Sequence, residues 1–200
     1  MIAHGRPVVP AGAVRRARRA ACAPADMRHC AAMGSLDAQA ARIEAATAAI
    51  LALRDRVERA GPWPLAELYG TEAEASWGPP ELLAHLEEML PYWLGEIERI
   101  LDGPPDAAVP FGRVATDDVR IGVIGRDRTV PLRELFARLE ADATRVAARL
   151  RELTVEQAGH RGLHPARGEL SIVDIVERFL VGHLEEHVGQ LRDILAARGA

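Results

Sequence analysis

The chain of 200 residues carries 25 basic side chains, all of them arginine, against 29 acidic ones, and its formal net charge is −4. This length suits a single domain with an appendage and is ample for a large core. No apolar run is long enough to span a bilayer, and the N-terminus lacks the apolar stretch of a secretory signal. We therefore expect a cytoplasmic protein without a membrane partner. The acidic body argues against nucleic acid as the main partner.

The charges are unevenly distributed along the chain. Residues 1–34 hold one acidic residue, Asp26, and six arginines: Arg6, Arg15, Arg16, Arg18, Arg19 and Arg28. This stretch is rich in proline, glycine and alanine and has no apolar periodicity. We therefore predict a disordered basic extension over residues 1–34 and a folded domain over residues 35–198.

Helical periodicity dominates the rest of the sequence, together with alanine, leucine, glutamate and arginine, which favour helices. The first helix is predicted from Leu36 to Ala60, where Gly61-Pro62 ends it. The second opens at Pro79-Pro80 and runs to about Ile100. Pro91 lies inside it and removes a backbone hydrogen bond, so a kink is predicted there.

Residues 103–130 are predicted to form a long connection, with a short extended segment at Val119–Ile124. A connection of this length carries the chain from one end of a helical bundle to the other. The third helix is predicted from Leu132 to Leu153 and is followed by a loop. Ser171 and Asp174 then resemble a capping box that opens the fourth helix. The predicted fold is an all-α four-helix bundle with a long crossover connection between its second and third helices.

Two histidines stand four residues apart on the predicted fourth helix. His183 and His187 share one face of this helix and can both reach one metal ion. The same face carries the apolar stripe, so the imidazoles need partners. His85 lies on the apolar stripe of the second helix and can point into the same interior. Three neutral imidazoles that leave coordination positions open suit a divalent ion such as Zn²⁺, Ni²⁺, Fe²⁺ or Mn²⁺.

Two segments resemble the DinB/YfiT-like superfamily of metalloenzymes. One is Trp77-Gly-Pro-Pro-Glu-Leu-Leu-Ala-His-Leu86, which is similar to the start of that superfamily's second helix. The other is His164-Pro-Ala-Arg-Gly-Glu-Leu-Ser171, followed by His183-Leu-Glu-Glu-His187 and Gln190-Leu191, which is similar to its last loop and helix. The resemblance covers the chain from about Leu36 to the C-terminus. It implies that His85, His183 and His187 are the metal ligands.

The resemblance also implies chemistry on thiol cofactors. A bound divalent ion lowers the pKa of a thiol or a water molecule and so provides a nucleophile at neutral pH. The expected function is a metal-dependent thiol S-transferase that acts with a low-molecular-weight thiol, such as mycothiol, on a small-molecule electrophile. Two alternatives stay open: a metal-dependent hydrolase, and a non-catalytic stress-associated or partner-binding bundle.

Other residues near these motifs receive simpler interpretations. His183-Leu-Glu-Glu-His187 formally fits the His-x-x-Glu-His pattern of some zinc peptidases, but only thirteen residues follow it, too few to supply a distant glutamate ligand. Glu185 and Glu186 are expected on a charged helix face, with a proton-transfer role for Glu186 as the alternative. His160 and His164 are expected in a loop. We also expect a homodimer that pairs through the alanine-rich first helix.

Overall fold

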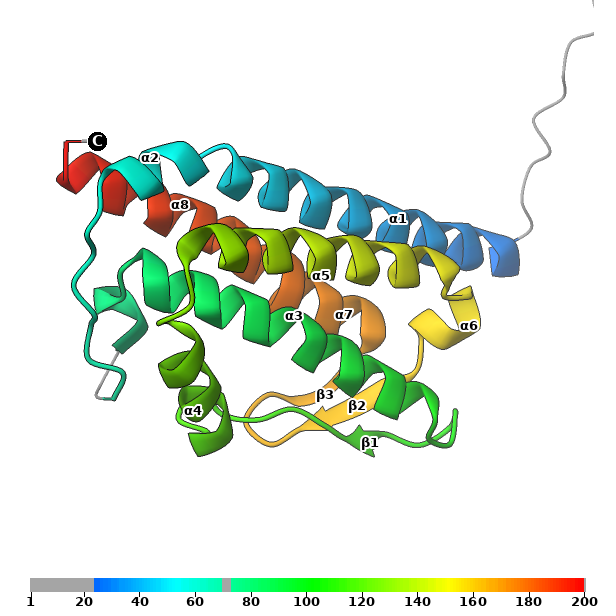
Figure 1. Ribbon diagram of the computed structural model, residues 1–200. Coiled ribbons are helices and arrows are strands. Elements are labelled where there is room, and N and C mark those ends of the chain that lie inside the picture. The colour runs from blue at the N-terminus through cyan, green and yellow to red at the C-terminus, as the bar shows by residue number, and fades with distance from the viewer. Residues whose placement is uncertain (1–23, 70–72, 200) are drawn as a thin grey trace, which may run out of the picture.

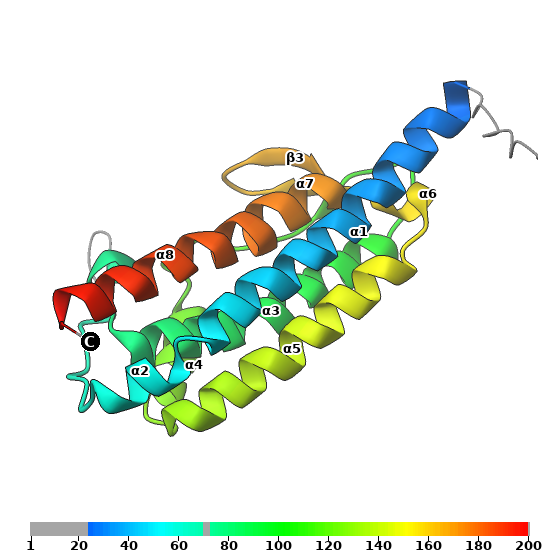
Figure 2. The same cartoon turned by 90° about the horizontal axis from the view of Figure 1, so that it is seen from above.

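The computed structural model describes residues 24–69 and 73–199, and within them the chain is mostly helical (Figure 1). Helix α1 (Pro24–Leu51) packs against α5 (Leu132–Glu152), and α5 packs against α3 (Pro79–Leu101). The last helical segment consists of α7 (Ile172–Val176), the π-helix η2 (Glu177–Val181) and α8 (Gly182–Ala197). Helix α8 contacts both α1 and α3, so these long segments lie side by side with their axes roughly aligned (Figure 2).

The helix boundaries agree with the predictions in part. Helix α5 is confirmed almost residue for residue, and α3 continues through Pro91. Helix α1 begins at Pro24, well before Leu36, and it ends at Leu51; α2 (Arg54–Arg59) follows as a separate short helix. The first 23 residues of the predicted basic extension lie outside the described residues.

The prediction of an all-α chain is wrong at one place, because three short strands form a small sheet. β1 (Val109–Pro110) pairs in parallel with β2 (Arg161–His164), and β2 pairs antiparallel with β3 (Gly168–Ser171). Gly162 in β2 packs so closely on Phe111 that an added Cβ would lie 2.4 Å from that ring. The sheet lies beside α3 and α7 and replaces the loop predicted around His160 and His164 (Figure 1).

The crossover connection also contains a helix where an extended segment was predicted. Helix α4 (Asp118–Asp127) begins after Asp117, whose side chain accepts a hydrogen bond from the backbone N–H of Arg120. This cap stabilises the first turn of a helix. Ile121 and Ile124 are then three residues apart on one buried face. Two further short helices complete the described elements, η1 (Ala73–Ser76), a 3₁₀-helix, and α6 (Val155–Ala158).

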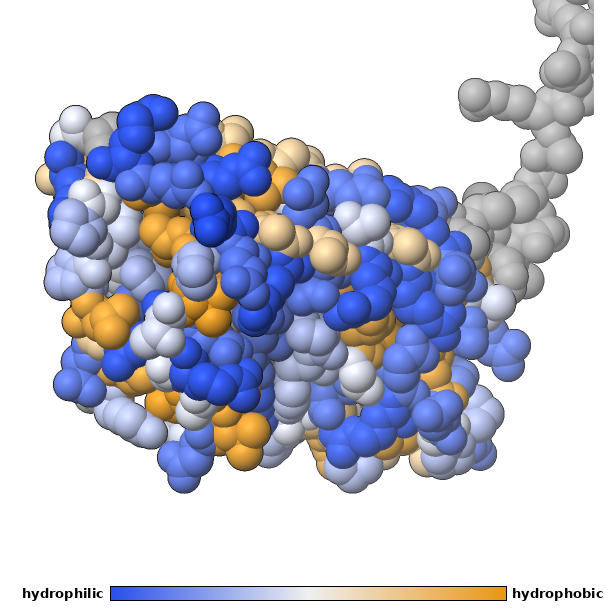
Figure 3. All heavy atoms as spheres, viewed as in Figure 1, coloured by the Kyte–Doolittle hydropathy of each residue, from blue (hydrophilic) through white to orange (hydrophobic). Residues whose placement is uncertain are grey.

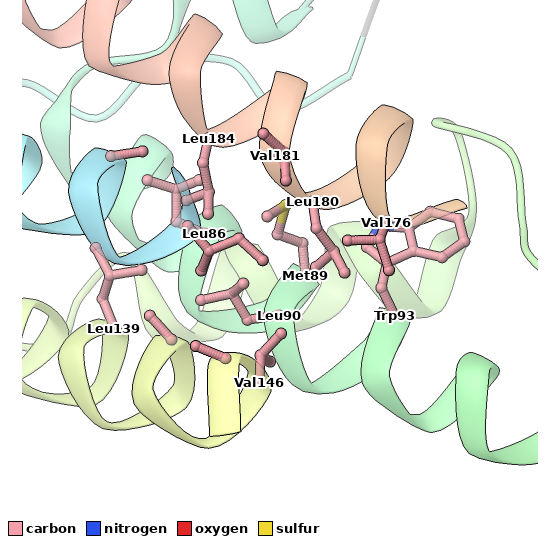
Figure 4. Close-up of a cluster of buried hydrophobic side chains, with 14 of the residues drawn as sticks. Leu86, Met89, Leu90, Trp93, Leu139, Val146, Val176, Leu180, Val181 and Leu184 are labelled. Atoms are coloured by element: carbon pink, nitrogen blue, oxygen red, sulfur yellow. The ribbon is translucent and has the colours of Figure 1, made fainter. Parts of the chain in front are cut away.

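One hydrophobic core holds the long helical segments together (Figure 4). Helix α3 supplies Leu86, Met89 and Leu90 to it, and α5 supplies Leu139 and Val146. The last helical segment faces them with Val176, Leu180, Val181 and Leu184. All these side chains are almost completely excluded from solvent, so burial of this apolar surface is the main source of stability.

The outer surface shown in Figure 3 is mainly hydrophilic, with hydrophobic side chains in small separate groups. None of the helices in the described part of the chain is long and apolar enough to cross a membrane.

Candidate metal centre

The π-helical turn η2 determines which way the two histidines of α8 face. The predicted capping box is confirmed at the start of α7, the segment before this turn: Ser171 accepts from the backbone N–H of Asp174, and the Asp174 side chain accepts from that of Ser171. In an unbroken α-helix His183 would stand two turns after Val176 on the same core-facing side. The extra residue in the π turn displaces it by about one residue step, about 100°. His183 and His187 therefore lie at the edge of the core, next to two cavities.

Three imidazoles from α3 and α8 converge at this edge. The Nε2 atom of His183 lies 2.8 Å from Nε2 of His85 and 3.0 Å from Nε2 of His187. His85 and His187 are each 3 % exposed, and the side chain of His183 is 26 % exposed. The structure thus brings together all three residues that the sequence predicted as ligands.

Hydrogen bonding alone does not satisfy these three nitrogens. In a neutral imidazole, Nε2 carries either one hydrogen or one lone pair in the ring plane. The Nε2 atom of His183 faces two other Nε2 atoms, so it can pair properly with only one of them. A metal ion accepts a lone pair from each of the three. Tetrahedral Zn²⁺ with Zn–N distances of about 2.0–2.1 Å would separate its ligand nitrogens by about 3.3 Å, close to the spacing found here.

The electrostatic surroundings keep the imidazoles neutral. Burial lowers the pKa of His183 to about 3, and the neighbouring His187 and Arg120 add to this effect. Burial likewise lowers the pKa of His85 well below its usual value and lowers that of His187. A metal ligand must be the neutral imidazole, so all three have the charge that metal binding requires at neutral pH.

A second set of contacts orients one of the rings. Nδ1 of His187 lies 2.8 Å from Oε1 of Gln190, and since this oxygen can only accept, the hydrogen of His187 is on Nδ1. Its Nε2 lone pair is therefore directed at the other two imidazoles. The amide of Gln190 also donates to the backbone carbonyl of Glu74 at 2.7 Å, which ties α8 to η1. Such outer contacts commonly fix the orientation of histidine ligands.

Glu74 is a possible fourth ligand that the sequence did not reveal. One of its carboxylate oxygens and one nitrogen of each imidazole all lie within 4.8 Å of one another, so these four residues could hold a metal ion. Glu74 lies in η1, and no spacing relates it to the histidines. Only tertiary structure places it here.

Arg120 competes with a metal ion for two members of this group. Its guanidinium forms an ion pair with Glu74 and donates to the carbonyl of Ala115 at 2.8 Å. It also lies 3.3 Å from Nδ1 of His85, and because a guanidinium can only donate, Nδ1 accepts there. This contact favours the tautomer with hydrogen on Nε2 of His85. For His85 to bind a metal through Nε2, its hydrogen must be on Nδ1, so Arg120 must move away from that atom.

The other sequence candidates lie around the group without joining it. Glu186 is 3.8 Å from Nδ1 of His183, and its side chain is 75 % exposed. Glu185 forms an ion pair with Arg42 at 2.7 Å, as expected for a charged helix face. Trp77 is a buried wall whose ring meets His85 edge-on. His164 is buried at the end of β2, outside the group of possible ligands.

Two cavities flank the histidines. The larger has a volume of about 1020 Å³ and is lined by His187, and the smaller, of about 390 Å³, is lined by His85 and His183. Both cavities reach Glu74, Arg120, Ala115 and Glu186, so the ion pair of Glu74 and Arg120 stands between them. A reacting centre at the histidines would be accessible from both sides.

Comparison with known proteins found no matching family model, no matching curated protein and no matching solved structure.

Proposed function

We propose that this protein is a four-helix-bundle metalloenzyme that transfers a low-molecular-weight thiol, such as mycothiol, to a small electrophile. The observation that carries this proposal is the convergence of three imidazole Nε2 atoms between two adjoining cavities. A transferase must hold two molecules with their reacting atoms together. A metal site at the junction of two binding volumes meets that requirement, and the resemblance to the DinB/YfiT-like superfamily supports it.

His85, His183 and His187 would hold the ion, and Glu74 would be a fourth ligand once Arg120 releases it. Three imidazoles with an optional carboxylate suit Zn²⁺, and also Ni²⁺, Fe²⁺ or Mn²⁺. When bound, the ion would lower the pKa of a thiol so that its thiolate forms at neutral pH.

The remaining residues would position the reactants and move protons. Apolar side chains line much of the larger cavity, among them Leu68, Trp77 and Ile121, so they would exclude water from the thiol. Glu186 lies at the junction of both cavities with its carboxylate largely in solvent. It can therefore accept the thiol proton and pass it to water.

Hydrolysis is a second candidate, and the position of Glu74 favours it. A carboxylate next to the histidine group can take a proton from an attacking water molecule, as general bases do in metal-dependent hydrolases. In that case one cavity would bind the substrate and the other would supply water.

The two functions are separated by parallel assays on the Zn²⁺-loaded protein. Consumption of glutathione, N-acetylcysteine and mycothiol is followed with 1-chloro-2,4-dinitrobenzene and monobromobimane, and hydrolysis is followed with p-nitrophenyl acetate. We expect thiol consumption that is lost in His183→Gln and kept in the matched variant His160→Gln, which lies outside the group. Ester hydrolysis with the same dependence on His183 would instead support the hydrolase. Inactivity in both assays would contradict both and favour the non-catalytic bundle.

A homodimer stays part of the proposal. Gel filtration of the full chain would show it as an apparent mass twice that of the 21.7 kDa monomer.

A further inference from the structure

The smaller cavity combines arginines with a group of stacked rings. Its lining includes Arg113, Arg120, Arg167 and Arg178. It also includes Trp93, His164 and Phe179, and two acidic residues, Glu74 and Glu186. The cavity therefore offers positive charge and flat apolar surface within a volume of about 390 Å³, beside His85 and His183.

Two of the four arginines already have partners. Arg113 forms an ion pair with Glu88 at 2.5 Å and lies over the ring of Tyr92, 3.6 Å from its centroid. Arg120 is paired with Glu74 and bonded to a backbone carbonyl. Both side chains are largely buried, so their charges are compensated inside the protein.

Arg167 and Arg178 differ from these two. Among the described side chains, those of residues 36–69 and 74–199, neither guanidinium has an ion-pair or hydrogen-bond partner, and both residues are exposed at the cavity. They come from different elements, Arg167 from the turn between β2 and β3 and Arg178 from η2. Glu186 is the only acidic lining residue left without an arginine partner in this part of the chain. The cavity thus has an excess of positive charge that a ligand can neutralise.

The rings form a nearly parallel stack. Phe179 lies 4.3 Å from Trp93 and 5.2 Å from His164, measured between ring centroids, with interplanar angles of 18° and 17°. The three rings come from three different elements, Trp93 from α3, His164 from β2 and Phe179 from η2. The stack favours a flat ligand over a bulky branched one.

We infer that the smaller cavity binds a small carboxylate with a planar apolar body, its charge at Arg167 and Arg178 and its flat part against the stack of Trp93, Phe179 and His164. This inference rests on the proposed transferase function and names the class of its electrophile, a planar carboxylic acid that can take up the thiol sulfur. Either the S–H of the thiol adds across a carbon–carbon double bond conjugated with the carboxylate, or the sulfur displaces a leaving group such as a halide from an aromatic ring. The volume is at the small end of ligand pockets, which suits a molecule of about ten heavy atoms. Guanidinium groups bind carboxylates well because two N–H groups can meet the two oxygens.

Binding of benzoate and benzyl alcohol to the full chain in EDTA tests the inference without relying on the metal. The two probes share the ring and differ in the charge, and titration calorimetry measures both. We expect benzoate to bind at least about tenfold more tightly than benzyl alcohol. The double variant Arg167→Gln/Arg178→Gln should reduce this preference to less than about twofold, whereas Arg133→Gln, which removes one positive charge from α5, away from the cavity, should leave it unchanged. Phe179→Leu should weaken both probes alike.

Equal affinity for the two probes would overturn the inference. So would a preference for benzoate that survives the double variant, or one that falls equally in Arg133→Gln. Unchanged binding of both probes to Phe179→Leu would overturn the role of the ring stack. These titrations contain no metal, so a negative result would not count against metal binding or thiol transfer. Conversely, a negative result in the metal or thiol assays would not count against carboxylate binding in the smaller cavity.

Discussion

Replacement of His183 by glutamine should remove most of the stabilisation by metal without weakening the metal-free protein. His183 is the central residue of the group, because its Nε2 atom contacts both other imidazoles. With Zn²⁺ at one hundred times its dissociation constant, binding stabilises the folded state by about 2.7 kcal/mol. A chain of this size gains about 2–4 °C in melting temperature per kcal/mol, so the wild type should rise by about 5–11 °C.

Loss of one ligand should sharply reduce this stabilisation by Zn²⁺. If four ligands share a binding free energy of about 10–16 kcal/mol, each is worth at least about 2.5 kcal/mol, or close to one hundredfold in affinity. At the same Zn²⁺ concentration, His183→Gln should then gain only about 0.4 kcal/mol, or about 1 °C. In EDTA the variant should melt within about 2 °C of the wild type, because the unsatisfied contact at Nε2 is removed along with the imidazole.

Differential scanning fluorimetry with Zn²⁺, Ni²⁺ and Mn²⁺ measures these shifts. His160→Gln is the matched control and should keep the full rise, since His160 lies outside the group. Equal stabilisation of the wild type and His183→Gln by a metal would refute the three-histidine site.

Three further predictions address charge and packing. In EDTA, the free energy of unfolding should fall as the pH drops from 6.5 to 5. Burial lowers the folded-state pKa of all three imidazoles, that of His183 to about 3, so over this range the unfolded chain binds protons that the folded chain does not. Each imidazole contributes up to about 1.4 kcal/mol per pH unit, and urea melts that stay flat over this range would contradict the shifts. Arg120→Gln should raise the affinity for Zn²⁺ at least about tenfold in a chelator competition, because it frees Glu74 and removes a like charge; unchanged affinity would show that Arg120 does not compete with the ion. Gly162→Ala should cost about 1–3 kcal/mol in urea melts, whereas Gly95→Ala, with open space around its Cβ, should be neutral or stabilise by up to about 1 kcal/mol; equal effects would argue against the tight contact with Phe111.

The sequence predicts those parts of the fold that local patterns determine. The apolar spacing of α5 and the proline start of α3 are sufficient for both helices, and the capping box locates the start of α7. The strands were missed because each has four residues or fewer. β1 also pairs over a long distance in sequence, as Val109 does with Gly162, whereas β2 and β3 form a short local hairpin. Short elements of this kind depend on tertiary contacts.

Helix α4 was predicted wrongly for a different reason. Its sequence, Val119-Arg-Ile-Gly-Val-Ile124, alternates in a way that is typical of strands, and the cap at Asp117 is a weaker signal that points to a helix.

The residues of the candidate site likewise fall into two groups, those that a local sequence pattern predicts and those that only tertiary structure brings together. The four-residue spacing of His183 and His187 is local, and His85 could be added because it lies on an apolar stripe. Glu74 and Arg120 could not be predicted, since they lie 46 residues apart and meet only in the folded chain. Glu74 comes from a segment without apolar periodicity, and Arg120 comes from the segment whose alternation indicated a strand. The direction of neither side chain could therefore be inferred from the sequence.

The π turn at Glu177–Val181 has a consequence for how this protein is compared with others. The core-facing positions of α7 and α8 are offset by one residue across this turn. The two helices therefore have to be aligned separately with a related sequence, although the chain is continuously helical. A homologue with an uninterrupted helix would need a one-residue gap within Glu177–Val181 to superimpose its histidines on His183 and His187. Without that gap, an alignment would match the ligand-bearing face of α8 to core residues and report the motif as lost.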